Sequence, residues 1–189
     1  ARRLVPAMLL GWLASSALAI GLVGPLPLEV FQTPVPWIKL AYAVALAATA
    51  AVLTARLARP IARLGLPETA VVGVVGTMAL VGLGVWATTP SDQQWVAVLG
   101  KTWWVCPWLL MGFSVPALAG ILWALRGVAP TQTHKAGFAS GLLAGAVGAA
   151  GYSLACPESS ATFVAIWYTL GISLTALIGR QLGPHVLRW

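Results

Sequence analysis

The side chains best suited to chemistry in this chain are its two cysteines, Cys106 and Cys156. Each is followed directly by proline, and each stands at the boundary of a long apolar run. A pair of thiols can close a disulfide, react reversibly with oxidants or bind soft metal ions. Three roles remain open for the pair: a permanent structural disulfide, a reversible sensor of oxidants or soft metals, or two unrelated buried cysteines.

The rest of the chain offers little for catalysis or for a metal site. The sequence has no Walker loop, no H-E-x-x-H, no Gly-rich nucleotide motif and no nucleophile elbow. We interpret its two histidines, His134 and His185, as isolated, solvated residues. A metal held by Cys106, Cys156 and Glu158 would lack the four ligands of a tight zinc site. The sequence accordingly predicts no enzyme, no cofactor and no firm metal site.

Composition identifies an integral membrane protein. The chain has 189 residues, of which 59% are hydrophobic and 8% charged, and its mean hydropathy is +0.88. Soluble domains usually carry about a quarter charged residues. The polar connections are too short to fold as a soluble domain, so we expect one transmembrane domain over residues 1–189, with the lipid bilayer as its surroundings and no small-molecule substrate.

Six apolar runs are long enough to cross a bilayer, which takes roughly 20 residues as a helix. Backbone groups inside lipid must be satisfied within the segment, and the runs are too long for barrel strands. The sequence therefore predicts an all-α fold, a bundle of six transmembrane helices. The predicted spans cover residues 4–23, 37–57, 68–87, 105–125, 136–155 and 161–179.

The basic residues predict the orientation of these spans. The net charge of +7 would suggest nucleic acid for a soluble protein, but here its distribution matters more than its sum. Of the eleven basic residues, nine fall on one side of the predicted membrane and only Lys39 and Lys101 on the other. We expect the side chains of Lys39 and Glu68, which lie near the ends of their spans, to reach the membrane surface by snorkelling. The positive-inside rule then places both termini in the cytoplasm and both cysteines outside, in a multi-pass protein of the bacterial inner membrane. The basic residues of the cytoplasmic side are Arg2, Arg3, Arg56, Arg59, Arg63, Arg126, Lys135, Arg180 and Arg188.

Glycines recur every three to four residues in the fifth predicted span, at Gly137, Gly141, Gly145 and Gly148. Such spacing forms a groove into which a neighbouring helix can pack closely. We therefore expect this span to be the central helix, packed either within the chain or against a second copy. Six of the ten tryptophans fall in the outer half, which favours an interfacial belt over an aromatic ligand cage.

The beginning of the chain admits two interpretations. Arg2 and Arg3, an apolar run and the triplet 17–19 of small residues also fit a secretory signal peptide. The apolar run continues past that triplet, which favours a retained first span. The chain begins with alanine, so we expect a natural N-terminal segment to be missing.

Several segments together resemble the NrsF-type negative regulators of sigma factor F. The resemblance is most specific at the two Cys-Pro pairs and at the closing Gly-Pro-x-x-Leu-Arg-Trp. It covers nearly the whole chain. The segments that carry it are residues 101–107, 125–131, 141–145, 156–158, 167–168 and 182–189.

The resemblance implies a six-span anti-sigma factor of the inner membrane. Such a protein holds an extracytoplasmic-function sigma factor on the cytoplasmic side and releases it under heavy-metal or oxidative stress. By this resemblance the sensing positions would be Cys106 and Cys156. Members of the family begin with a short cytoplasmic segment before the first span, whereas this chain opens almost directly on Arg2 and Arg3.

A thiol-disulfide oxidoreductase or a small transporter is the alternative function. A disulfide-generating oxidase often has a closely spaced Cys-x-x-Cys, which this sequence lacks. A transporter usually has inverted repeats, and no repeat relates the two halves of this chain. The regulatory interpretation is therefore preferred.

Overall fold

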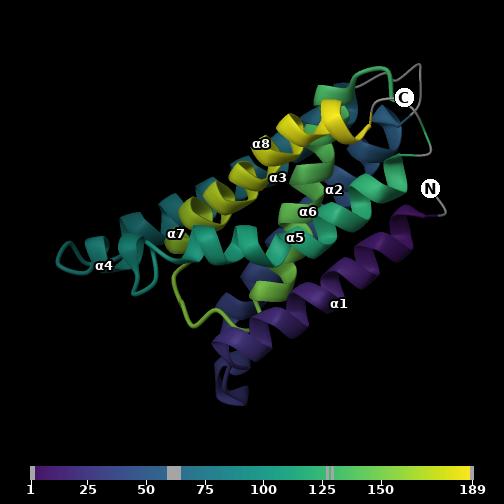
Figure 1. Ribbon diagram of the computed structural model, residues 1–189. Coiled ribbons are helices and arrows are strands. Elements are labelled where there is room, and N and C mark those ends of the chain that lie inside the picture. The colour runs from purple at the N-terminus through teal and green to yellow at the C-terminus, as the bar shows by residue number, and fades with distance from the viewer. Residues whose placement is uncertain (1–2, 59–64, 127, 129, 188–189) are drawn as a thin grey trace.

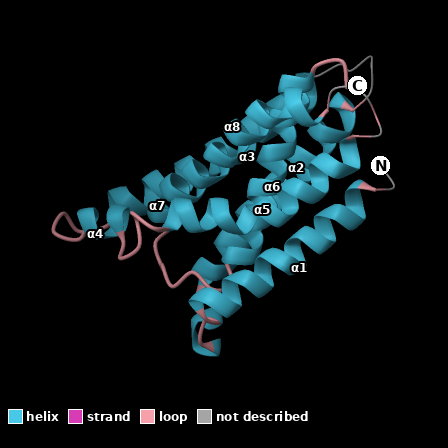
Figure 2. Cartoon of the chain, viewed as in Figure 1, coloured by secondary structure: helices cyan, strands magenta, loops and turns pink. Residues whose placement is uncertain are grey.

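The computed structural model describes residues 3–58, 65–126, 128 and 130–187 (Figure 1). Within these ranges the chain is helical and has no strand (Figure 2). The long helices lie alongside one another in a bundle, and α1 begins at the end of the bundle where α8 finishes. The elements are α1 Leu4–Val23, η1 Leu28–Gln32, α2 Pro34–Leu57, α3 Gly65–Thr88, α4 Gln94–Leu99, α5 Cys106–Leu125, α6 Thr133–Tyr152, α7 Ala161–Phe163, η2 Val164–Tyr168 and α8 Thr169–Val186.

Five helical stretches of the described chain are long and apolar enough to cross a membrane. They are α1, α2, α3, α5 and the continuous helix from α7 through α8. The predicted all-α fold is confirmed, and each predicted span coincides with a helix. The fifth predicted span, α6, is not among the five, because its glycines and the polar Thr133, His134 and Lys135 at its beginning lower its mean hydropathy.

α6 is the centre of the bundle. It contacts α8, α2, α5 and α1, and nearly all of its residues from Ala136 to Tyr152 are buried. A Cβ added at Gly141 would collide with the backbone of Thr175 and Ala176, and one at Gly145 would lie 3.0 Å from the Cα of Ile172. The glycines thus let α6 and α8 touch backbone to backbone. Packing within the chain, one of the two alternatives, accounts for the glycine spacing.

The glycine row serves more than one neighbour, which its regular spacing does not reveal. Gly137 lies against Gly179 and Gly183 of α8, and the next two glycines of the row also lie against α8. Gly148 instead lies against Ser114 of α5, where an added Cβ would be 2.9 Å from the Cα of that serine. The groove therefore turns around α6 toward α5 near its end.

The connections that join α1 to α2 and α3 to α5 both contain short helices, although the first is rich in proline. η1 follows Pro27, and α2 begins at Pro34, earlier than predicted. Proline fits the first turn of a helix because no partner is needed there for its missing N–H. The second loop contains α4.

The last helix also differs from its prediction. It continues beyond Gly179 to Val186 and contains a π-helical turn, Val164–Tyr168. Pro184 stands in its final turns without ending it at once. Of the basic residues used to predict the orientation, Arg2, Arg59, Arg63 and Arg188 lie outside the described residues.

Candidate thiol site

The structure brings the two cysteines together at one end of the bundle. Cys106 is the first residue of α5, and Cys156 lies in the connection that follows α6. Both cysteines are free, both are fully buried, and their thiols form a hydrogen bond with each other. Because α5 and α6 run antiparallel, the beginning of one lies level with the end of the other. A thiol pair in contact has the geometry from which a disulfide can form.

Local backbone turns hold each cysteine in place. The N–H of Cys106 donates to the carbonyl of Thr102 (2.8 Å), so a turn leads directly into α5. The N–H of Cys156 donates to the carbonyl of Tyr152 (2.9 Å), which carries the last turn of α6 onward. Pro157 follows and offers no further N–H to continue it. The two Cys-Pro pairs thus mark the beginning of one helix and the end of another.

Lys39 of α2 is part of the same site, and its predicted snorkelling is wrong. Its side chain is 1% exposed, and its ammonium Nζ donates to the carbonyl of Cys156 at 2.9 Å. A buried ammonium is costly unless it is hydrogen-bonded. Carbonyl oxygens beyond the carboxyl end of a helix supply such partners, and the helix dipole favours a cation there. Lys39 therefore points into the bundle, toward the end of α6.

Glu158 holds the loop before α5. Its Oε1 accepts from the backbone N–H of Lys101, the N–H of Thr102 and the hydroxyl of Thr102, each at 2.8 Å. Among the described residues, no three His, Cys, Asp or Glu side chains are arranged to hold a metal ion. Gly100 precedes this contact with φ +58, and a Cβ there would strike Glu158 and Phe163. Only glycine fits that position without strain.

Aromatic side chains enclose the thiols from within the bundle. Tyr152 and Tyr168 stack with ring centroids 5.9 Å apart, and Phe113 lies 5.5 Å from Tyr152. Both tyrosines interact with the thiols of Cys106 and Cys156. The hydroxyl of Tyr168 is buried and lacks a hydrogen-bond partner of good geometry within the described structure. The site is thus lined by aromatic rings, and the Tyr168 hydroxyl lies beside the Cys156 thiol.

The two thiols are chemically unequal. The pKa of the Cys156 thiol is lowered, chiefly by the hydrogen bond that it accepts from the Cys106 thiol. Burial opposes this shift, and the positive charge of Lys39 adds to it. Since the thiolate is the reactive form, Cys156 is the better nucleophile and metal ligand of the pair.

Sequence reasoning identified both cysteines but missed Lys39, Tyr152 and Tyr168 as their neighbours. A single lysine within an apolar span is a signal that could have drawn attention to Lys39, because a charge buried in a membrane helix is usually paired. His134 and His185 are exposed, as expected. The tryptophans Trp37, Trp95, Trp104 and Trp108 are largely exposed, which fits a belt at the membrane surface.

The chain is similar over its whole length to known proteins. The family model described as negative regulator of sigma F matches residues 1–189. The anti-sigma-F factor NrsF of Caulobacter vibrioides is 38% identical over 193 aligned residues, which cover 100% of this chain and 89% of that protein. A probable anti-sigma-F factor NrsF of Azospira oryzae is 39% identical over 163 residues, or 82% of this chain and 73% of that protein. No solved structure matches. The chain therefore belongs to the NrsF family of negative regulators of sigma F.

Proposed function

We propose that this chain is a membrane anti-sigma factor that holds an extracytoplasmic-function sigma factor at the cytoplasmic face of the inner membrane. Oxidation or metal binding at Cys106 and Cys156 releases that sigma factor. Support for a sigma-factor partner comes from the two relatives, both described as anti-sigma-F factors. The observation that carries the sensing step is the pair of free, fully buried thiols in mutual contact.

The proposed topology has six spans, with α6 as the fifth, and both termini in the cytoplasm. The predicted orientation rests on the excess of basic residues on one side of the membrane. Reporter fusions after Pro90 and after Thr131 test it directly. We expect export of the first and cytoplasmic retention of the second. The opposite result at either position would contradict the topology and the outer position of the thiols.

Sensing changes the covalent or coordination state of the pair. An oxidant that accepts two electrons converts the two thiols into one disulfide, with loss of two protons. A soft metal ion replaces the thiol protons without any electron transfer. Either change locks the beginning of α5 to the connection after α6, which the thiol hydrogen bond joins only weakly.

The signal has a short route to the opposite face. α5 and α6 are joined at their other ends by residues 126–132, and α6 packs along most of α8. A change in how α5 lies against α6 is therefore felt at the face where we place the sigma factor. Coupling of this kind requires two discrete arrangements whose balance depends on the thiol state.

The test is sigma-dependent transcription in cells that carry the full-length protein, with and without cadmium or an oxidant. Cys106→Ser and Cys156→Ser should each abolish the response while membrane insertion stays intact. The double variant should be no worse than either single variant, because the pair acts as a unit. Ser153→Ala is the matched control, since it changes a buried residue of the same connection without touching a thiol. A normal response in the double variant would refute thiol sensing.

A further inference from the structure

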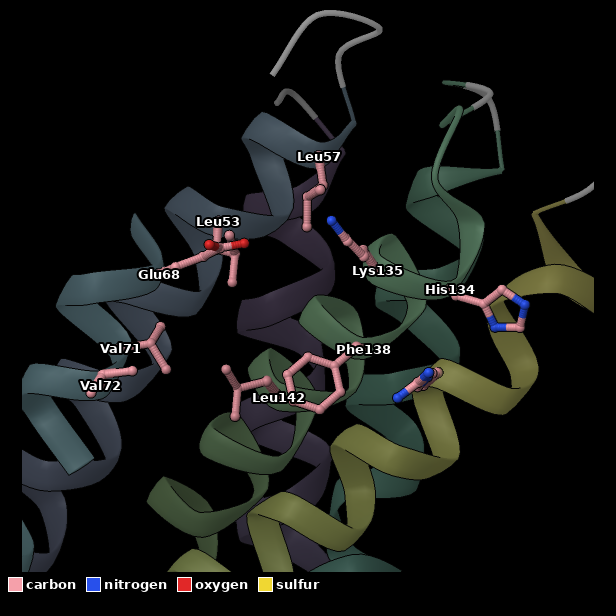
Figure 3. A pocket seen from close by; sticks show the side chains of 10 residues that line it. Leu53, Leu57, Glu68, Val71, Val72, His134, Lys135, Phe138 and Leu142 are labelled. Carbon is pink, nitrogen blue, oxygen red and sulfur yellow. The ribbon is translucent and has the colours of Figure 1, made fainter. Parts of the chain in front are cut away.

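A second site lies at the end of the bundle opposite the thiols. A cleft of about 670 Å³ separates the beginning of α3 from α6 and α8, and Leu53 and Leu57 of α2 also line it. Figure 3 shows Val71 and Val72 on one wall and Phe138 and Leu142 facing them from α6. This volume lies within the range of small-molecule sites, roughly 300 to 1,000 Å³.

The cleft exists because α3 contacts different neighbours near its two ends. Near its finish, Gly82 lies so close to α7 and η2 that an added Cβ would be 2.6 Å from the Cβ of Ala165, and Thr162 donates to the carbonyl of Gly82 at 2.9 Å. Near its beginning, α3 packs on α2 and leaves a gap toward α6 and α8. The gap is open to the side, where membrane lipid would lie.

The charges at the cleft have opposite signs on its two sides. Lys135 of α6, Arg180 of α8 and Glu68 of α3 all line the cleft, together with His134. Figure 3 shows the side chain of Lys135 reaching toward the side of the cleft on which Glu68 lies. Within the described part of the chain, neither Lys135 nor Arg180 forms an ion pair with a carboxylate. A ligand that satisfies all three groups carries an anion near the two bases and a cation near the acid. Its remainder must be apolar, since valine, leucine and phenylalanine line the walls.

We propose that this cleft binds one phosphatidylethanolamine molecule. Its phosphate would pair with Lys135 and Arg180, its ammonium would pair with Glu68, and an acyl chain would lie against Val71 and Phe138. Basic pockets between membrane helices are known to take lipid head groups. An anionic lipid without an ammonium would leave Glu68 facing a negative head group. Phosphatidylcholine would offer Glu68 a cation that donates no hydrogen bond. The proposal is independent of the thiol pair and of the sigma factor.

Native mass spectrometry of the purified full chain, titrated with three lipids of equal chain length, tests the proposal. We expect one phosphatidylethanolamine to be retained more tightly than phosphatidylglycerol or phosphatidylcholine. Replacing both bases, Lys135→Gln with Arg180→Gln, should weaken its retention about tenfold, because charge-assisted contacts are lost. Glu68→Gln should remove the preference over phosphatidylglycerol while phosphatidylglycerol binding persists. Arg126→Gln, a base of the same predicted side that does not line the cleft, should change neither value.

Two controls keep the outcome decisive. All three side chains are exposed, so the variants should fold normally, and an unchanged elution volume in detergent would verify that. Val72→Trp fills the cleft without altering charge and should reduce retention of all three lipids. Equal retention of the three lipids by the unaltered protein would overturn the proposal. So would tighter binding of phosphatidylglycerol, or a Lys135/Arg180 double variant that keeps its phosphatidylethanolamine.

Discussion

α3 and α6 occupy opposite extremes within one bundle. α3 is the most apolar of the long helices, yet its only buried residues are Pro67, Met78 and Gly82. α6 is not apolar enough to count as a span by composition, yet it is buried almost throughout. In lipid, apolar side chains gain nothing by turning inward, whereas small residues gain close backbone contact. High hydropathy thus marks a helix on the outside of this bundle, while small residues mark the helix at its centre.

The same contrast extends to the connections that follow these helices. The connection after α3 is largely exposed, including Asp92. The connection after α6 buries Cys156 and Glu158 and is held by the side chain of Lys39. The same kind of substitution should therefore lower the free energy of unfolding strongly around α6 and hardly at all on α3.

The largest difference in stability is expected when one glycine of α6 and one glycine of α3 are each replaced by alanine. In Gly141→Ala the new Cβ would lie 2.8 Å from the Cα of Ala176, and backbone cannot move aside cheaply. We expect a loss of about 3 kcal/mol in the free energy of unfolding. Gly76→Ala is the control, because nothing lies within 4 Å of a Cβ there. Reversible unfolding in mixed detergent micelles measures both, and equal stability of the two variants would break the comparison.

Next comes the acid that ties the connection after α6 to the loop before α5. Glu158→Ala leaves the N–H groups of Lys101 and Thr102 without their acceptor, which should destabilise the protein by about 2 kcal/mol. Asp92→Ala removes an equal charge from the exposed connection after α3 and should change stability by less than about 0.5 kcal/mol. The same unfolding assay applies. A silent Glu158→Ala would mean that the carboxylate does not hold the loop.

A smaller effect, on reactivity, is expected from Lys39→Met. The positive charge of Lys39 helps to lower the pKa of Cys156, so its loss raises that pKa and shifts the rate of thiol modification to higher pH. A rise of one unit would slow modification about tenfold at pH values below the pKa. Modification by methyl methanethiosulfonate, located by mass spectrometry, gives the rate at each pH. Lys101→Met is the control, and equal profiles for both variants would exclude a role for Lys39.

The smallest effect concerns the single hydrogen bond that ties α3 to α7. Thr162→Val removes the donor to the carbonyl of Gly82 and should cost about 1 kcal/mol. Thr77→Val removes a hydroxyl that bonds only within α3, to the carbonyl of Gly73, on an exposed surface. Its unfolding midpoint should match that of the unaltered protein. If both threonine variants were equally affected, the contact with α7 would add nothing to the attachment of α3.

Helix ends could be predicted wherever turn residues follow an apolar run. α1 ends at Val23 as predicted, because Gly24 with φ +98 and then Pro25 follow it. The finish of α8 could not be predicted, since neither Gly179 nor Pro184 ends it: Gly179 packs on Gly137, and Pro184 lies in the last turns. Tertiary packing determines where α8 ends, and the local sequence pattern does not predict it.

The candidate site could be predicted in part for similar reasons. Cys106 and Cys156 are rare residue types at matching depths of adjacent antiparallel helices, so their proximity follows from topology. Lys39 lies 117 positions before its partner, and its place near a helix end fits equally well with a solvated side chain. Which side of a helix faces inward is only weakly encoded where all sides are apolar. Contacts such as this one therefore required the structure.

A helix that is buried along most of its length does not have to be stable in lipid by itself. During synthesis α6 leaves the ribosome before α8, the helix on which it packs most extensively, has been made. Until α8 has been made, the glycine-rich surface of α6 can pack only against the earlier helices α1, α2 and α5. Its own sequence provides little drive to leave the translocation channel for the bilayer. The earlier helices must therefore receive α6 as they assemble, and a nascent chain that stops before α8 is expected to hold α6 less firmly than the complete protein does.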